Sequence, residues 1–206
     1  ASGIAESDRF GQDFNALLAE LQGWHAGLTS ENAELQRRAT HDGLTGLGNR
    51  ALFDQKLAEA IAESQRTGMS FALLFLDIDR FKRVNDAFGH SSGDAALIAV
   101  GERLRGAVRQ IDSAFRLGGD EFAVLLAPFF SREHLDGVVA RVRAAMENPF
   151  RMPNGQLATA SLSVGVAVFP EDGANAEELL SQADTAMYRD KESRHQAGPE
   201  GIDHDA

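Results

Sequence analysis

Two acidic segments that follow apolar runs are the parts of this sequence best suited to chemistry. The first is Asp77-Ile78-Asp79, which comes directly after the apolar residues 71–76. A continuous apolar run is typical of a central strand that is covered on both faces. A carboxylate at the end of such a strand loses hydration unless a positive charge compensates it, and a divalent cation would do so. For Asp79 the alternative is a helix cap, because a helix is predicted to begin near Arg80.

The second acidic segment is a predicted hairpin tip. Gly118-Gly119 separates two apolar runs and precedes Asp120 and Glu121. Glycine adopts positive φ without steric cost, so we expect the two glycines to form the centre of a tight turn. If the hairpin lies beside the first strand, Asp77 and Asp120 become ligands of the same metal ion. The alternative is a polar turn with two solvated acids.

The hairpin also carries a family resemblance. Residues 118–122, Gly-Gly-Asp-Glu-Phe, resemble the signature of the GGDEF family, the diguanylate cyclases, which condense two GTP molecules into cyclic di-GMP. Similar blocks recur in order from Asp42 to about Lys191. The resemblance implies a palm-like α/β (α+β) nucleotidyl cyclase fold with a mixed central sheet flanked by helices, β-α-α-β-β-α-β in order, over residues 41–194.

The resemblance also implies a metal-dependent reaction. One GTP 3′-hydroxyl attacks the α-phosphate of another and expels pyrophosphate, twice per product, so alignment and charge neutralisation matter most. Asp77, the Ile78 carbonyl and Asp120 are the expected ligands of Mg²⁺ or Mn²⁺, two ions per active site. Asp120, Glu121 and Lys82 are the expected catalytic residues. Glu121 is either a metal ligand or a proton acceptor.

Residues 81–94, FKRVNDAFGHSSGD, resemble the family block F-K-x-x-N-D-x-x-G-H-x-x-G-D. By that resemblance Asn85 and Asp94 bind guanine, and Lys82 lies near the phosphates. The chemistry suits guanine, because a carboxylate can accept hydrogen bonds from both N1–H and the 2-amino group, and adenine offers neither. His90 either contacts the nucleotide or holds the adjoining loop.

Arg109 and Asp112 form an R-x-x-D pattern just before the hairpin. Many family members carry an inhibitory site for the product at this spacing. Arginine can stack on guanine and grip a phosphate, and aspartate can bind the base edge. The alternative is a surface ion pair, which contributes little to stability.

The end of the domain departs from the family pattern. Where the family commonly continues K-x-x-G-R-N, this chain has Lys191, then Arg194 at the usual glycine and His195 at the usual arginine. Lys191 is retained as the expected phosphate contact. The departure predicts weaker triphosphate binding and leaves open an alternative function, a catalytically weak GGDEF domain that senses GTP or cyclic di-GMP.

Helices are predicted over 50–66, 94–108, 131–148 and 176–193, strands over 71–77 and 160–169, and a hairpin turn over 152–156. Residues 195–206 are polar and predicted to be disordered.

Residues 1–40 are predicted to be a helical stalk, either a coiled coil or a helix that packs on its own domain. The stalk also resembles the second helix of HAMP modules. Its heptad positions are Phe10, Phe14, Leu17, Leu21, Trp24, Leu28 and Leu35.

Composition restricts the possible partners and cellular location of the protein. A formal charge of −11 argues against nucleic acid as a partner, and zero cysteines fit a cytoplasmic domain. No apolar run approaches the roughly 18 residues of a membrane span. The chain begins Ala1-Ser2-Gly3, so we expect an upstream sensor region to be absent and the parent protein to be anchored in the inner membrane. GTP, cyclic di-GMP and a second copy of the chain are the expected partners. A purely structural coiled-coil module would leave the acidic strand ends unexplained.

Overall fold

The computed structural model describes residues 22–25, 27, 29, 31, 34–129 and 131–197, with side chains to Arg194. Most of the predicted stalk and the tail from residue 198 lie outside the described residues, including the heptad positions Phe10, Phe14, Leu17, Leu21 and Leu28. The chain divides into two units, residues 1–39 and 40–206. Among the described helices, none combines the length and the apolar character that a membrane span requires.

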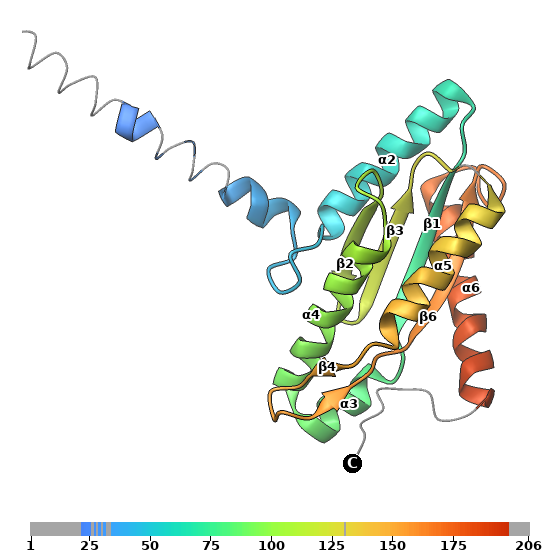
Figure 1. Ribbon diagram of the computed structural model, residues 1–206. Helices are drawn as coiled ribbons and strands as arrows, with labels where there is room; N and C mark the ends of the chain where they lie inside the picture. The colour runs from blue at the N-terminus through green and yellow to red at the C-terminus, as the bar shows by residue number, and fades with distance from the viewer. Residues whose placement is uncertain are drawn as a thin grey trace, which may run out of the picture. The chain divides into compact units, whose positions relative to one another are not determined.

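The larger unit is built on a four-stranded sheet in the order β2-β3-β1-β6 (Figure 1). Its strands are β1 (Phe71–Ile78), β2 (Ser113–Gly118), β3 (Glu121–Leu126) and β6 (Leu162–Phe169). Every residue of β1 is buried, as the apolar run predicts. All pairings are antiparallel, whereas a mixed sheet was expected. The reason is that β3 lies between β1 and β2, which run in the same direction but do not pair.

Helices cover both faces of the sheet (Figure 1). The core on one face combines Leu74 and Leu76 of β1 with α4 (His90–Ala107) and α5 (Arg132–Met146). The core on the other face combines Leu73 and Phe75 with α2 (Arg50–Thr67) and α6 (Ala176–Ala197). Alternate side chains of a strand point to opposite faces, so one apolar strand supplies both cores. The result is a three-layer α/β/α arrangement.

Shorter elements complete this unit. Helix α3 (Phe81–Phe88) connects β1 to α4, and β4 (Phe150–Arg151) pairs with β5 (Leu157–Ala158). The predicted helix over 50–66 is confirmed, because the Asn49 side chain accepts a hydrogen bond from Leu52 N and Gly68 ends the helix at φ 74°. The final helix, predicted to end at Ser193, continues to Ala197.

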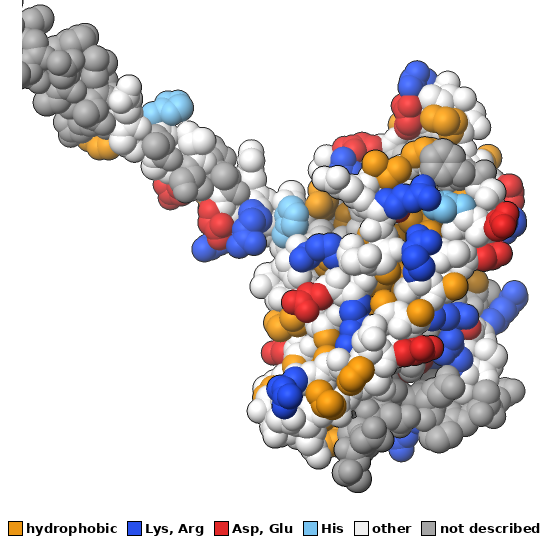
Figure 2. Space-filling model, in the orientation of Figure 1, with side chains coloured by type: hydrophobic (Ala, Val, Ile, Leu, Met, Phe, Trp, Pro, Cys, Tyr) orange, Lys and Arg blue, Asp and Glu red, His pale blue; other side chains and the backbone are white. Residues whose placement is uncertain are grey.

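The surface of this unit mixes charges of both signs. In the view of Figure 2, Lys and Arg side chains are interspersed with acidic and apolar ones over α4 and α5. The excess of acidic residues in the sequence therefore does not make this face uniformly negative.

The smaller unit is helical wherever it is described. Trp24 and Leu35, two of the predicted heptad positions, are 65% and 59% exposed. Glu34 pairs with Arg37 and Arg38 one turn later. Exposed apolar side chains at heptad spacing favour a helix that needs a partner, and the coiled coil stays a prediction.

Candidate functional site

The two acidic segments meet at one end of the sheet. Strands β1 and β3 are antiparallel, and Asp77 lies directly opposite Glu121. Asp120 precedes Glu121 in the turn, and its carbonyl accepts a hydrogen bond from Ile78 N at 3.3 Å. The structure therefore brings Asp77, Ile78 and Asp120 together, although they come from segments about 40 residues apart in the chain.

The turn differs in detail from the sequence prediction. Gly118 and Gly119 both have positive φ, 145° and 52°, as expected. Gly118 pairs with Glu121, however, so the central residues of the turn are Gly119 and Asp120, one position later than predicted. A register shift between Arg116 and Gly118 produces this difference. It places Asp120 at the tip of the turn.

Asp77 lies in a concentrated cluster of charge. Its side chain is 12% exposed, and the Lys191 ammonium lies 2.6 Å from its Oδ1 atom. Burial raises the pKa of Asp77, and the negative charges of Asp120 and Asp79 raise it further against the opposing effect of Lys191. Burial alone would lower the pKa of Lys191, but the bond to Asp77 and the three negative charges raise it. Such a site favours additional positive charge.

Asp79 has a different role from the predicted helix cap. Helix α3 begins after Arg80, which has φ 58° and provides no side-chain cap. The Asp79 side chain is buried and accepts hydrogen bonds from the hydroxyls of Ser161 and Ser163. Its N–H donates to the Ser161 carbonyl at 3.0 Å. The cap prediction is wrong because Asp79 faces β6, where it fixes the end of β1 to the neighbouring strand.

The donor set suits a cation that arrives with a phosphate ligand. Within the described part of the chain, no group of three or more His, Asp or Glu side chains is arranged to hold a metal. Mg²⁺ in nucleotide sites commonly takes only one or two protein carboxylates, with waters and substrate phosphates completing the shell. Asp77, Asp120 and the Ile78 carbonyl fit that pattern. Burial and the charges of Asp120 and Asp79 raise the pKa of Asp77, and a bound cation would oppose these effects.

The residues predicted to bind guanine lie just beyond the end of β1. Asn85 is in α3, and His90 and Asp94 are in the first turns of α4. A Cβ atom at Gly93 would lie 2.0 Å from the Asn85 Oδ1 atom, so only glycine allows the amide to pack against α4. His90, Asp94 and Lys82 are exposed. This helix corner presents polar side chains at the end of the sheet that carries the acids.

Arg116 connects the turn to the loop that precedes α2, a role that sequence reasoning missed. Its Nε and Nη2 atoms donate to the Gly119 carbonyl at 3.1 and 2.8 Å. Its Nη1 atom donates to both oxygens of Asp42 at 3.2 and 3.1 Å. Asp42 also accepts hydrogen bonds from the Thr45 hydroxyl and amide. The backbone of the turn is thus held by a residue of β2 and, through it, by residues 42–45.

Comparison with known proteins identifies the family. The family model described as "Diguanylate cyclase, GGDEF domain" matches residues 39–197. The chain belongs to the GGDEF family. It is 45% identical over 187 residues to the diguanylate cyclase TpbB of Pseudomonas aeruginosa, a match covering 91% of this chain and 43% of TpbB. The chain therefore spans less than half the length of that curated relative.

Solved structures support the same assignment. The GGDEF domain of TpbB (also called YfiN) matches with a TM-score of 0.72 and 42% identity, covering 74% of this chain and 89% of that one. The coiled coil and GGDEF domain of DgcB from Caulobacter crescentus, in complex with c-di-GMP, match with a TM-score of 0.77 and 29% identity, covering 87% and 95%. The palm-like fold predicted from the sequence is confirmed.

The contact between Asp42 and Arg116 predicts a pH-dependent stability of the GGDEF domain. Burial would raise the pKa of Asp42, but hydrogen bonds from Thr45 and Arg116 outweigh it and lower the pKa. The stabilisation is therefore present above the ordinary aspartate pKa and is lost as the pH falls through the lower folded value. We expect Asp42→Asn to lower the free energy of unfolding at pH 7 by about 1.5–3 kcal/mol. Urea unfolding should show this difference shrinking at acidic pH; a constant difference would contradict the ion-pair explanation.

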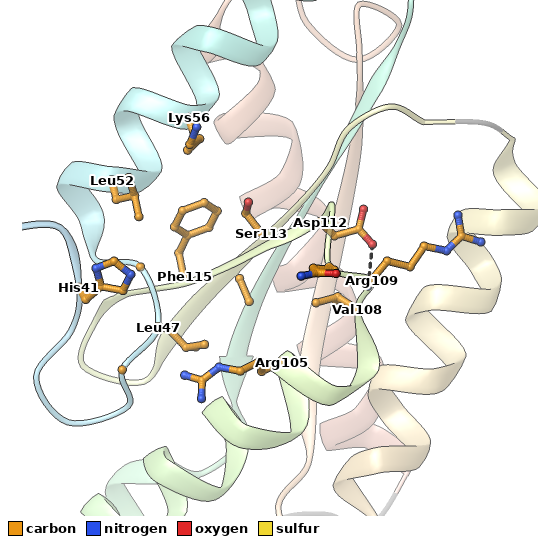
Figure 3. Close-up of a pocket in the computed structure, with 14 residues that line it drawn as sticks. His41, Leu47, Leu52, Lys56, Arg105, Val108, Arg109, Asp112, Ser113 and Phe115 are labelled. Atoms are coloured by element: carbon orange, nitrogen blue, oxygen red, sulfur yellow. Dashed lines mark hydrogen bonds between the residues drawn. The ribbon is translucent and has the colours of Figure 1, made fainter. Parts of the chain in front are cut away.

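Arg109 and Asp112, the two residues of the predicted product site, line a pocket of about 520 Å³. Figure 3 shows its lining from the loop around His41, helix α2, the end of α4 and strand β2. Asp112 is buried and accepts a hydrogen bond from the Arg109 backbone amide at 3.0 Å. The contact is thus a loop hydrogen bond and not the surface ion pair considered as the alternative. The Arg109 side chain extends away from the other lining residues.

Helix α6 carries Lys191 and is held tightly to β6. A Cβ atom at Gly165 would lie 1.9 Å from the Ala183 carbonyl oxygen, so glycine is required where the helix crosses the strand. Asp190 accepts hydrogen bonds from Val164 N at 2.9 Å and from the Arg143 guanidinium. These contacts hold the last part of helix α6, which carries Lys191, against β6.

The atypical segment after Lys191 is helical. Arg194, at the position of the usual family glycine, donates to the Asp190 carboxylate at 3.2 Å. The His195 side chain lies outside the described residues. Weaker triphosphate binding than in other family members stays a prediction, and the Arg194 contact supports it because the guanidinium already has a carboxylate partner.

Proposed function

We propose that this domain is a diguanylate cyclase that condenses two GTP molecules into cyclic di-GMP and two pyrophosphates. The observation that carries the proposal is the convergence of Asp77 and Asp120, from two strand ends, in a GGDEF domain whose relative TpbB is named a diguanylate cyclase. Acids at adjacent strand ends can face a triphosphate and the cations bound to it.

In this proposal the metal ligands are Asp77, the Ile78 carbonyl and Asp120, with Mg²⁺ or Mn²⁺ as the cofactor and two ions per site. The ions would neutralise phosphate charge and increase the acidity of the attacking 3′-hydroxyl. Glu121 lies opposite Asp77, and its carboxylate is 3.7 Å from the Arg50 guanidinium. It is placed either to accept a proton or to complete the metal shell.

Residues of the α3–α4 corner bind the nucleotide in this proposal. Asn85 and Asp94 hydrogen-bond the guanine edges, and His90 contacts the nucleotide or holds the loop. Lys82 lies near the phosphates, and Lys191 contacts them. The packing of Asn85 against Gly93 supports the assignment, because it places the amide against α4, the helix that also carries Asp94.

Catalysis in this proposal requires two copies of the domain. Each domain supplies one GTP site, so two domains must face one another, and the stalk brings them together. Exposed Trp24 and Leu35 support a coiled coil, as does the likeness to the DgcB structure, which includes one. The Arg116 contacts to Asp42 and Gly119 support control from the N-terminal side, because they connect residues just after the stalk with the catalytic turn.

The pocket at Arg109 and Asp112 would bind the product as an inhibitor.

A turnover assay across protein concentration tests the proposal. With GTP and Mg²⁺, the purified chain should form cyclic di-GMP and pyrophosphate, measured by chromatography and mass spectrometry. Below the dimer dissociation constant, doubling the protein concentration should raise the initial rate about fourfold, since the active species is a dimer. Absence of product at protein concentrations where sedimentation shows a dimer would contradict the enzyme assignment.

A second candidate function is a GGDEF domain that senses GTP or cyclic di-GMP without appreciable turnover. The observation that favours it is the Arg194–Asp190 contact at the position where the family usually has glycine. Calorimetric titration separates the candidates, because a sensor would bind GTP or cyclic di-GMP stoichiometrically while the turnover assay stays negative.

A further inference from the structure

We propose that Lys191 is a removable counter-ion of the metal site, which competes with the divalent cation for the Asp77 carboxylate. This inference rests on the proposed function, because it takes Asp77 as a metal ligand. The Nζ atom of Lys191 lies 2.6 Å from Asp77 Oδ1, the distance of a short charge-assisted hydrogen bond. Lys191 therefore occupies one of the two Asp77 oxygens that a cation in this site could use.

The site leaves little room for both cations. The Asp77 side chain is only 12% exposed, and its strand is flanked by Glu121 on β3 and Ser163 on β6. A Mg²⁺ ion binds a carboxylate oxygen at about 2.0–2.1 Å. At that position it would lie next to the Lys191 ammonium, with little water between the two positive charges to screen their repulsion. Binding of the metal therefore requires displacement of the lysine from Oδ1.

The helix itself cannot supply this displacement. Gly165 is in close contact with α6 at Ala183, and Asp190 binds Val164 N and Arg143, so the backbone beside Lys191 is fixed. The lysine stem is flexible and its side chain is 32% exposed, so the ammonium can leave Asp77 by rotation of its own side chain. Asp79 is an unsuitable acceptor after release, because two serine hydroxyls already bind its oxygens.

A nucleoside triphosphate can bind the Lys191 ammonium after its release from Asp77. Lys191 is the expected phosphate contact, so the metal–nucleotide complex supplies both the cation that replaces it at Asp77 and the anion that binds it afterwards. The exchange couples the two ligands: nucleotide raises metal affinity, and metal raises nucleotide affinity by the same factor. Without nucleotide, Lys191 keeps the affinity for free metal low.

Binding of Mn²⁺ to the full chain without nucleotide tests the competition. Electron paramagnetic resonance measures free Mn²⁺ directly. If Lys191 holds Asp77 about nine tenths of the time, Lys191→Met should tighten Mn²⁺ binding about tenfold. Arg194→Met is the matched control, because it removes the same charge from the same helix but contacts Asp190. Unchanged affinity in Lys191→Met, or equal tightening in both variants, would overturn the proposal.

Nuclear magnetic resonance of the lysine ammonium groups tests the displacement itself. The Lys191 Nζ signal, assigned by its loss in Lys191→Met, should shift on Mg²⁺ titration with the same midpoint as metal binding. A signal that stays unchanged while Mg²⁺ binds would show that both cations share Asp77, and the proposal would be wrong. Neither measurement needs turnover, so a failure here is distinguishable from a failure of the cyclase assignment.

Discussion

Asp120→Asn is expected to lower kcat for cyclic di-GMP synthesis by on the order of 10³-fold while the fold stays intact. Asp120 stands at the tip of the turn, where its carboxylate is the second acidic ligand of the predicted metal site. Its structural contact is made by the backbone carbonyl, which accepts from Ile78 N and is retained in the variant. An amide keeps the shape of the side chain but removes the negative charge that a divalent cation requires.

The matched control for this variant is Asp136→Asn on the exposed surface of α5, which makes the same change of charge away from the turn. Product formation should be close to that of the unmodified chain in the control and nearly absent in Asp120→Asn. Circular dichroism and thermal melting should be the same for all three proteins. Activity of Asp120→Asn within tenfold of the original would show that the Asp120 carboxylate is not a required metal ligand.

The parts of the site that sequence reasoning predicted are those with local signals. The apolar run before Asp77 indicates a buried strand, and Gly118-Gly119 indicates a hairpin, so the meeting of two acidic strand ends follows once the strands pair. The position of the turn was wrong by one residue, because the register shift near Arg116 is set by pairing across strands. Such a shift has no signature within the turn sequence itself.

The parts that were missed depend on contacts between distant residues. Asp42 and Arg116 are 74 residues apart, and Asp79 is 82 residues from Ser161. For Asp79 the sequence also offered a plausible local explanation, a helix cap, whereas nothing near Asp42 in the sequence points to Arg116. Asp190 binding to the β6 backbone likewise depends on where α6 crosses the strand. Only the packed structure shows which partner a polar side chain takes when both are chemically suitable.

The largest expected effect on stability comes from Gly165→Ala. The new Cβ atom would lie 1.9 Å from the Ala183 carbonyl and 2.4 Å from Met187 N, both backbone atoms that side-chain rotation cannot move away. Overpacking of this kind costs about 1–3 kcal/mol or more, so we expect a decrease near 3 kcal/mol. For a domain of this size the melting temperature should fall by roughly 6–12 °C. Differential scanning calorimetry measures both the temperature and the enthalpy of the transition.

Gly165→Ala should also lose activity at temperatures where it remains folded, because a shift of α6 moves Lys191 relative to Asp77. Gly137→Ala is the control: its Cβ atom would meet only the flexible Arg141 side chain at 3.8 Å, and alanine in a helix should add up to about 1 kcal/mol. If Gly165→Ala were as stable as the original chain but inactive, α6 would have moved without cost, and close packing would not be what positions the lysine. If it were less stable but fully active below its melting point, the phosphate contact proposed for Lys191 would tolerate displacement of the helix. Only loss of both stability and activity supports a geometry in which the close contact of α6 with Gly165 fixes the helix backbone that carries Lys191.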